Sequence, residues 1–259
     1  MTHTAAILEN VNVSLGNRPV LHGINIEFKS AKWTNIIGPN GAGKSTLLGA
    51  LAGLIPMTGK VMYPALLQSQ PNSKEKARHL AWLGQNQLGA DDLSVYDIVM
   101  LGRIPHQGWL SSPSAEDQLA VERSLKRTHA WESRTRSLKE LSGGERQRAL
   151  LARALAVNAD ILLMDEPLTS LDPPHQVDWL EVVKSLLAEQ KTVITVLHEL
   201  TISLLADEIV LLKCGQIEHQ GSSSNPVTHR AIEQVFENKV QILKLNDRWI
   251  SVPKITAEN

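Results

Sequence analysis

The sequence predicts an α/β fold with a mainly parallel sheet, an antiparallel β subdomain at the N-terminus and an inserted α-helical subdomain. Short apolar runs alternate with helical stretches along most of the 259 residues, which is typical of a parallel sheet covered by helices. Two runs of alternating polarity precede this pattern, and a charged helical stretch interrupts it. We expect residues 1–259 to form one domain, with the helical subdomain at about 90–157.

The N-terminal elements are predicted to be strands. Residues 7–13 and 20–28 both alternate apolar and polar side chains, as half-buried strands do, and a turn signal at 16–19 separates them. We therefore expect an antiparallel pair. The apolar, partly β-branched residues 34–37 predict a buried strand, and residues 46–52 predict a helix.

The remaining elements follow the same logic. Polar residues at 64–76 predict a surface loop, and the helical pattern of 95–136 is broken at 102–113 by glycine and proline. The other elements we expect are strands at 59–63, 80–83, 161–164 and 192–197, helices at 145–157, 175–189 and 231–236, and a hairpin of 209–212 with 216–219 around Gly215.

Composition limits the classes of protein. Hydrophobic residues make up 42%, enough for a core, and the net charge of −1 gives no electrostatic reason to expect a nucleic-acid partner. The one cysteine, Cys214, excludes an internal disulfide and predicts a packed or spectator thiol. We see no signal peptide, and no apolar run approaches the roughly 18 residues that span a bilayer. A role at a membrane would therefore need a partner.

Residues 38–46 fit the phosphate-binding pattern G-x-x-x-x-G-K-[ST], between the strand at 34–37 and the helix that follows. Its glycines let backbone N–H groups turn toward phosphate oxygens, and the helix start adds partial positive charge. Lys44 would reach the outer phosphates and Ser45 would bind magnesium. A glycine-rich turn that binds nothing would need neither the lysine nor the hydroxyl. The pattern therefore predicts a P-loop NTPase core.

Two carboxylates follow the predicted strand at 161–164. Ligands of such sheets bind at the carboxyl ends of the strands, where Asp165 suits a magnesium ligand and Glu166 suits a general base. Solvated acids at a strand end are the alternative, and the phosphate loop in the same chain makes that less favoured.

Ser142, Gly143 and Gly144 directly precede the helix at 145–157, which is again a design for binding an anion. An ordinary N-cap with flexible glycines is the alternative. Two such helix starts do not easily serve one nucleotide from the same side, so the second would serve a nucleotide held by another subunit. His198, at the end of the strand at 192–197, could contact the terminal phosphate or the attacking water, although a lone histidine there is more often structural.

In this order the motifs resemble those of the nucleotide-binding subunit of an ABC transporter, over nearly the whole chain. The signature shortly before the acidic pair is far more specific to this family than the phosphate loop is. The matching stretches are residues 38–46 (Walker A), Gln85 (Q-loop), 141–147 (signature), 161–166 (Walker B), 170–172 (D-loop) and His198 (switch histidine).

The resemblance implies a magnesium-dependent ATPase in which two copies pair head to tail around two ATP molecules. Glu166, His198, Lys44 and Gln85 would be catalytic, with Gln85 also sensing magnesium and the membrane subunits. By position, ATP would be bound by Gly38, Pro39, Asn40, Gly41, Ala42, Gly43, Lys44, Ser45 and Thr46, the partner's ATP by Ser142, Gly143, Gly144 and Asp172, and Mg²⁺ by Ser45, Gln85 and Asp165.

Some positions depart from the family pattern. Leu15 stands where an adenine-stacking aromatic is usual, so the adenine contact stays unassigned. Glu145 replaces a glutamine found in many members, and Glu199 replaces a frequent aspartate. We expect the first of these two changes to be mild.

Residues 95–106 resemble the corresponding stretch of importers for iron–siderophore, haem and vitamin B12. That resemblance implies transmembrane permease subunits, an upstream substrate-binding protein and a place on the cytoplasmic face of the inner membrane. A soluble ABC ATPase of DNA repair or translation is the alternative, but the chain has one ATPase unit and no sustained heptads between Thr46 and Leu141. A small-molecule kinase would not need the signature, and a pure binding protein would not need Lys44, Asp165 and Glu166 together.

Overall fold

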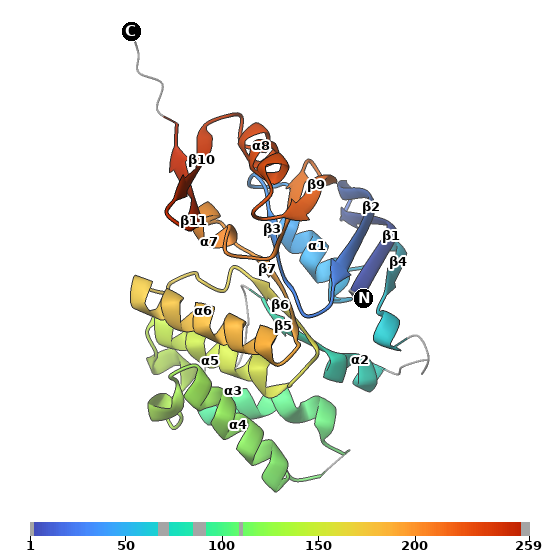
Figure 1. Cartoon of the computed structure of the whole chain (residues 1–259). Coiled ribbons are helices and arrows are strands. Elements are labelled where there is room, and N and C mark those ends of the chain that lie inside the picture. The colour runs from blue at the N-terminus through green and yellow to red at the C-terminus, as the bar shows by residue number, and fades with distance from the viewer. Residues whose placement is uncertain (1–2, 67–72, 85–91, 109–110, 255–259) are drawn as a thin grey trace. The chain divides into compact units, whose positions relative to one another are not determined.

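The structure, a computed structural model, describes residues 3–66, 73–84, 92–108 and 111–254 (Figure 1). The chain divides into two compact units, one formed by Met1–Ala65 with Ile194–Asn259 and the other by Leu66–Val193. The 3-10 helix η1 (Pro64–Leu66) and the strand β7 (Thr192–Val196) lie at the two divisions. Each unit is described by itself.

An antiparallel sheet of order β2-β1-β4 opens the first unit, which confirms the predicted pair at 7–13 and 20–28. Ala6 and Leu8, and beyond a register shift Val11 and Val13, are buried in β1, because alternate residues of a strand point to the same face. The strands of this sheet are β1 (Thr4–Leu15), β2 (Arg18–Lys29) and β4 (Thr58–Met62).

The first unit also carries parallel strands. All residues of β3 (Trp33–Ile37) are buried, and β3 pairs in parallel with β8 (Glu208–Lys213). The predicted hairpin is present, because β8 turns back at Gly215 into β9 (Gln216–Ser222). Trp33 Nε1 of β3 donates to Thr195 Oγ1 of β7 at 2.9 Å. The helix α1 (Lys44–Leu51) follows β3 along the chain.

A C-terminal hairpin, which was not predicted from the sequence, completes the first unit. Thr201 donates from Oγ1 to the Ser251 carbonyl at 3.4 Å and accepts from the Ser251 N–H at 3.1 Å. The rings of His229 and Trp249 lie 4.3 Å apart, so the hairpin packs against a helix. The elements are α7 (Leu200–Ser203), α8 (Pro226–Val235), β10 (Val240–Leu245) and β11 (Arg248–Pro253).

In the second unit, β5 (Leu80–Leu83) pairs in parallel with β6 (Ile161–Asp165). Both strands lie where the sequence predicts them, and the parallel pairs of the two units confirm the α/β fold class. The predicted loop at 64–76 is wrong at its end, because α2 (Ser73–His79) starts at Ser73. This stretch is rich in good helix formers, and Arg78 Nε anchors it by donating to the Pro105 carbonyl at 2.7 Å.

The predicted helical pattern of 95–136 is confirmed, and its break contains a 3-10 helix rather than only a loop. Serine side chains cap two of these helices: Ser94 accepts from Asp97 N–H, and Ser114 forms a capping box with Asp117. Besides α2, the helices of this unit in the part of the chain that the structure describes are α3 (Val95–Met100), η2 (Leu101–His106), α4 (Ala115–Arg127), η3 (Trp131–Ser133), η4 (Leu138–Glu140), α5 (Gly143–Ala156) and α6 (Pro173–Ala188).

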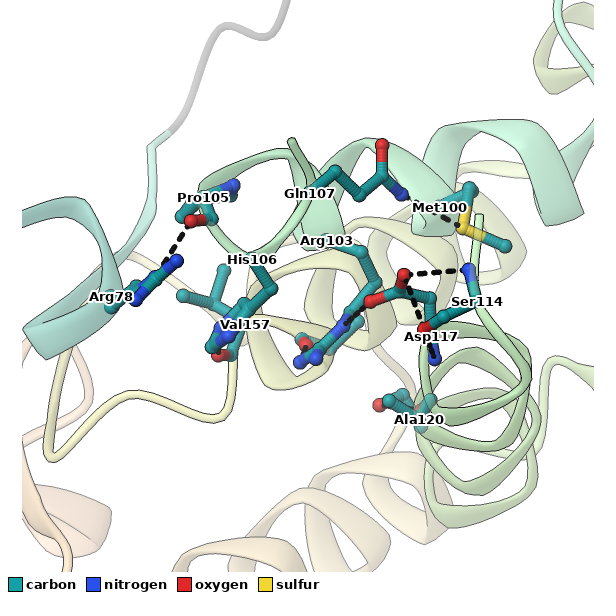
Figure 2. Close-up of polar contacts among 12 residues, drawn as sticks. Arg78, Met100, Arg103, Pro105, His106, Gln107, Ser114, Asp117, Ala120 and Val157 are labelled. Atoms are coloured by element: carbon teal, nitrogen blue, oxygen red, sulfur yellow. Dashed lines mark hydrogen bonds and ion pairs between the residues drawn. The ribbon is translucent and has the colours of Figure 1, made fainter. Parts of the chain in front are cut away.

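A buried ion pair joins η2 to α4 and α5 (Figure 2). Arg103 is 3% exposed and Asp117 is 4% exposed, and Arg103 Nε donates to Asp117 Oδ1 at 2.9 Å. The same guanidinium donates from Nη1 to the Ala156 carbonyl at 2.8 Å, at the end of α5. Ser114 completes the partners of the carboxylate, because its N–H and its hydroxyl both donate to Asp117 Oδ2.

The charge of Asp117 is favoured by these bonds. Burial alone would raise the pKa of Asp117, but the hydrogen bonds from Arg103 and Ser114 outweigh it and lower this pKa. The pair is therefore ionised at neutral pH. It fixes the C-terminal end of α5, whose N-terminal end carries Ser142.

Candidate nucleotide-binding site

The phosphate loop of the first unit leaves β3 at Gly38 and enters α1 at Lys44. A Cβ atom at Gly38 would lie 2.0 Å from the Leu212 carbonyl oxygen, so only glycine fits beside β8. Gly43, the N-cap of α1, has a φ of 100°, a conformation that favours glycine. The loop shape that the sequence pattern predicts therefore depends on these two glycines.

The Lys44 side chain lies across the loop. It is 6% exposed, and its Nζ donates to the carbonyls of Gly38 and Pro39 at 2.9 and 3.0 Å. These bonds hold the positive charge of the ammonium group at the loop. The geometry fits the role that the sequence predicts for Lys44.

The hairpin tip between β8 and β9 ties the loop to the neighbouring strand β2. The Gly215 N–H donates to the Ala42 carbonyl at 3.0 Å, and the Gly215 carbonyl accepts from His22 N–H at 2.9 Å. A Cβ atom at Gly215 would lie 2.1 Å from the Val20 carbonyl oxygen, so this contact is close. Beside it, Cys214 is exposed, with a φ of 47°. The thiol is therefore not packed.

His198 and the phosphate loop line one cavity of about 190 Å³. Pro39 and Asn40 come from the loop, His198 from the end of β7, and Leu200 and Phe236 from α7 and the end of α8. The structure thus brings together two sites that lie some 150 residues apart in the sequence. The sequence analysis missed Leu200 and Phe236, since nothing in the local pattern marks them as neighbours of the loop.

In the second unit, Asp165 ends β6 and is 5% exposed. The chain then turns sharply, because Glu166 adopts a left-handed conformation with a φ of 52°. Such a conformation costs about 1–3 kcal/mol outside glycine and is found preferentially at functional sites. Thr169 donates from Oγ1 to Glu166 Oε2 at 3.5 Å. The two acids thus stay adjacent but differ in setting, one buried and one half-buried.

Ser142 is the N-cap of α5, which begins at Gly143 rather than at the predicted residue 145. Its hydroxyl oxygen accepts from Glu145 N–H at 3.3 Å, and its own N–H donates to Glu145 Oε2 at 2.8 Å. These bonds from Ser142, with Arg136 also contributing, lower the pKa of Glu145. Glu145 thus closes a capping box, a role that glutamine could also serve.

Gly143 and Gly144 lie against the segment that follows Glu166. A Cβ atom at Gly143 would be 3.1 Å from Ser170 Cβ, and one at Gly144 would be 3.1 Å from the Ser170 carbonyl oxygen. Gln147 Nε2 donates to the Pro167 carbonyl at 3.1 Å. The second unit therefore packs the signature against the stretch that leads to Asp172, the N-cap of α6. Ser170 belongs to the stretch 170–172 predicted from the sequence, but its contact with Gly143 and Gly144 was not predicted.

The predicted site residues fall into two groups. The first unit holds residues 38–46 and His198, and the second holds Ser142, Gly143, Gly144, Asp165, Glu166 and Asp172. The predicted Gln85 lies outside the described residues. Leu15, at the position of the expected aromatic, is 51% exposed. Among the residues described, no helix combines the length and apolar character needed to cross a membrane.

Comparisons with known proteins agree with these motifs. A family model described as ABC transporter matches residues 21–169. The petrobactin import ATP-binding protein FpuD of Bacillus anthracis is 37% identical over 237 residues, covering 90% of this chain and 87% of that protein. The ferric enterobactin transport ATP-binding protein FepC of Escherichia coli (strain K12) is 36% identical over 248 residues, covering 94% and 92%.

A dimeric structure of a bacterial ABC transporter cassette is also similar to this chain. Its TM-score is 0.74 at 26% identity, with 85% of this chain and 99% of that chain covered. The matched family model spans more than half of the sequence, and the relatives match along nearly their full length. The chain therefore belongs to the ABC transporter family, as an ATP-binding subunit that hydrolyses ATP.

Proposed function

We propose that this chain energises an importer for iron–siderophore complexes or for a related large chelate such as haem or cobalamin. The support is the sequence identity of more than a third with two proteins. FpuD is a petrobactin import ATP-binding protein, and FepC is a ferric enterobactin transport ATP-binding protein. Residues 95–106, which the sequence analysis likens to that group, form α3 and η2. The chain would attach to transmembrane permease subunits at the cytoplasmic face of the inner membrane and receive solute through an upstream substrate-binding protein.

The composite site is supported by one observation: each unit carries a helix that begins beside glycines, a geometry suited to an anion. Gly43 opens α1 in the first unit, and Ser142 opens α5 in the second. We propose that two identical copies pair head to tail, so that residues 38–46 of one copy and Ser142, Gly143, Gly144 and Asp172 of the other hold one ATP. The dimeric relative is consistent with this arrangement. Within it, residues 1–259 act as one nucleotide-binding domain with a helical subdomain at about 90–157.

The chemistry of hydrolysis follows from the remaining side chains. Lys44, held at the loop by two carbonyls, neutralises charge on the outer phosphates. The Ser45 hydroxyl and the buried Asp165 carboxylate are hard oxygen donors that fit Mg²⁺, with Gln85 as a third ligand. Mg²⁺, when bound, supplies further charge neutralisation. Glu166 accepts the proton of the attacking water, and His198 donates to the terminal phosphate.

Replacing Ser142 with arginine is expected to abolish ATP-dependent pairing while ATP still binds the separate copies. The long cationic side chain would fill the second anion site, whereas residues 38–46 of the other unit would be untouched. Light scattering with and without Mg-ATP measures pairing, and equilibrium dialysis measures ATP binding. Ser94→Arg is the matched control, because Ser94 is also an N-cap of the second unit but belongs to α3. Dimers that persist in Ser142→Arg would contradict the composite site.

A further inference from the structure

We infer that Arg136 is a positioning residue that shields the partner's nucleotide from the negative charge of Glu145. The inference rests on the proposed composite site, in which Ser142, Gly143 and Gly144 receive the phosphates of ATP held by the other copy. It concerns how this chain accommodates a glutamate, rather than a glutamine, within the signature. The variants below separate this role from a purely structural one.

Both oxygens of the Glu145 carboxylate are engaged. Oε2 accepts from Ser142 N–H at 2.8 Å, and Oε1 accepts from Arg136 Nη1 at 2.8 Å. The side chain of Glu145 is 27% exposed and that of Arg136 is 42% exposed, so the pair lies at the surface beside the helix start. Glu145 is thus a full negative charge within the first turn of α5.

The negative charge of Glu145 has two opposite effects at the start of α5. A carboxylate in the first turn stabilises the helix start, because it complements the positive end of the helix dipole. It also repels the phosphates that the same helix start is proposed to bind. A glutamine would close the capping box without this repulsion. The glutamate in this chain therefore needs a neighbouring cation if the site is to keep its affinity for an anion.

Arg136 is fixed in the place where it can offset that charge. Besides its bond to Glu145, its Nη2 donates to the Glu140 carbonyl, at the end of η4. Just before this helix start, the Ser137 N–H donates to Glu140 Oε2 at 2.8 Å, as the Ser142 N–H donates to Glu145, and Arg136 joins the two helix starts. The guanidinium is held from two sides, and its positive charge stays beside the signature.

The Ser142 hydroxyl is held in place by the same glutamate. Its oxygen accepts from Glu145 N–H at 3.3 Å, and the hydroxyl also bonds to the Glu145 carboxylate, whose pKa it helps to lower. The N–H groups of the first helical turn have no partner within a helix and point the same way. Arg136 and Glu145 together hold these donors in place with little net charge.

The test compares Arg136→Ala, Glu145→Gln and the double variant, in full-length chain. Arg136→Ala should raise the KM for ATP by roughly 3–10-fold at low salt and leave kcat within about twofold, because an unshielded charge then faces the nucleotide. The increase should shrink at high salt. Glu145→Gln in the Arg136→Ala background should restore the KM, since it removes the charge and keeps the cap. Rescue by this second change is a readout that a structural role of Arg136 would not give.

Arg134→Ala is the matched control. Arg134 lies two residues away and stacks over the Trp131 ring at 4.4 Å. Its removal should leave the KM unchanged. A double variant no better than Arg136→Ala, or an equal rise in KM at all salt concentrations, would overturn the inference. If the unmodified chain shows no ATP-dependent pairing, the proposed function fails instead; if it pairs and Arg136→Ala has an unchanged KM, only this inference fails.

Discussion

Glu166→Gln is expected to lower steady-state ATP turnover by roughly 10²–10⁴-fold while ATP affinity stays close to that of the unmodified chain. Glutamine keeps the size of the side chain but cannot accept the proton of the attacking water. Glu166 directly follows the buried Asp165 and holds a left-handed backbone conformation. This backbone conformation fixes the direction in which the Glu166 side chain leaves the end of β6. Phosphate release measures turnover, and equilibrium dialysis measures affinity.

Glu181→Gln controls for the general effect of removing a carboxylate, because Glu181 is exposed on α6. Glu181→Gln should retain turnover within about twofold, because substitutions at exposed positions with no structural partner usually have small effects. Near-normal hydrolysis by Glu166→Gln would remove Glu166 from the role of general base. A parallel loss of ATP affinity would also contradict the prediction, since it would place the effect in binding rather than in chemistry.

Asp117→Ala is expected to lower the free energy of unfolding by about 3–5 kcal/mol. The substitution leaves the Arg103 guanidinium buried, with its bond to the Ala156 carbonyl still in place. An uncompensated buried charge is costly because it loses hydration without gaining an ionic partner. Urea titration followed by circular dichroism measures the change.

Glu122→Ala is the control on the same helix. Its carboxylate pairs with Lys126, but the two side chains are 39% and 59% exposed, so the expected loss is at most about 0.5 kcal/mol. The pH dependence gives a second check. Because the pKa of Asp117 is lowered in the folded state, its stabilisation is present above about pH 3.9 and is lost as the pH falls through the folded-state pKa. A loss of 3–5 kcal/mol that does not diminish as the pH falls further below about 3.9, or equal losses in both variants, would contradict the assignment.

Motifs made of adjacent residues were predictable, because the residue types and their spacing indicate the chemistry without any knowledge of the fold. Residues 38–46 combine glycines, a lysine and a hydroxyl at fixed spacing, and the buried strand before Asp165 and Glu166 has a length and apolarity that specify it. Ser142 was recognisable from the glycines and the helix that follow it. These elements appear where the sequence predicts them, while the roles of their side chains stay predictions.

Features that depend on distant partners were not predictable. The hairpin of β10 and β11 is stabilised by Thr201, some 50 residues before Ser251, and the C-terminal end of α2 is anchored by a bond from Arg78 to Pro105. Neither contact has a local signal. The pair of Arg103 and Asp117 likewise joins residues on separate helices, and only the packing of η2 against α4 and α5 brings their charges together.

The hydrogen bond from the Gly215 N–H to the Ala42 carbonyl lies beside a residue that can carry a fluorescent label. The sole thiol, Cys214, is exposed at the residue that precedes Gly215. A small environment-sensitive fluorophore attached there would sit within one residue of a contact to the phosphate loop, and no other cysteine would compete for the label. Its emission could therefore follow the arrival and departure of a nucleotide in real time, without any engineered substitution.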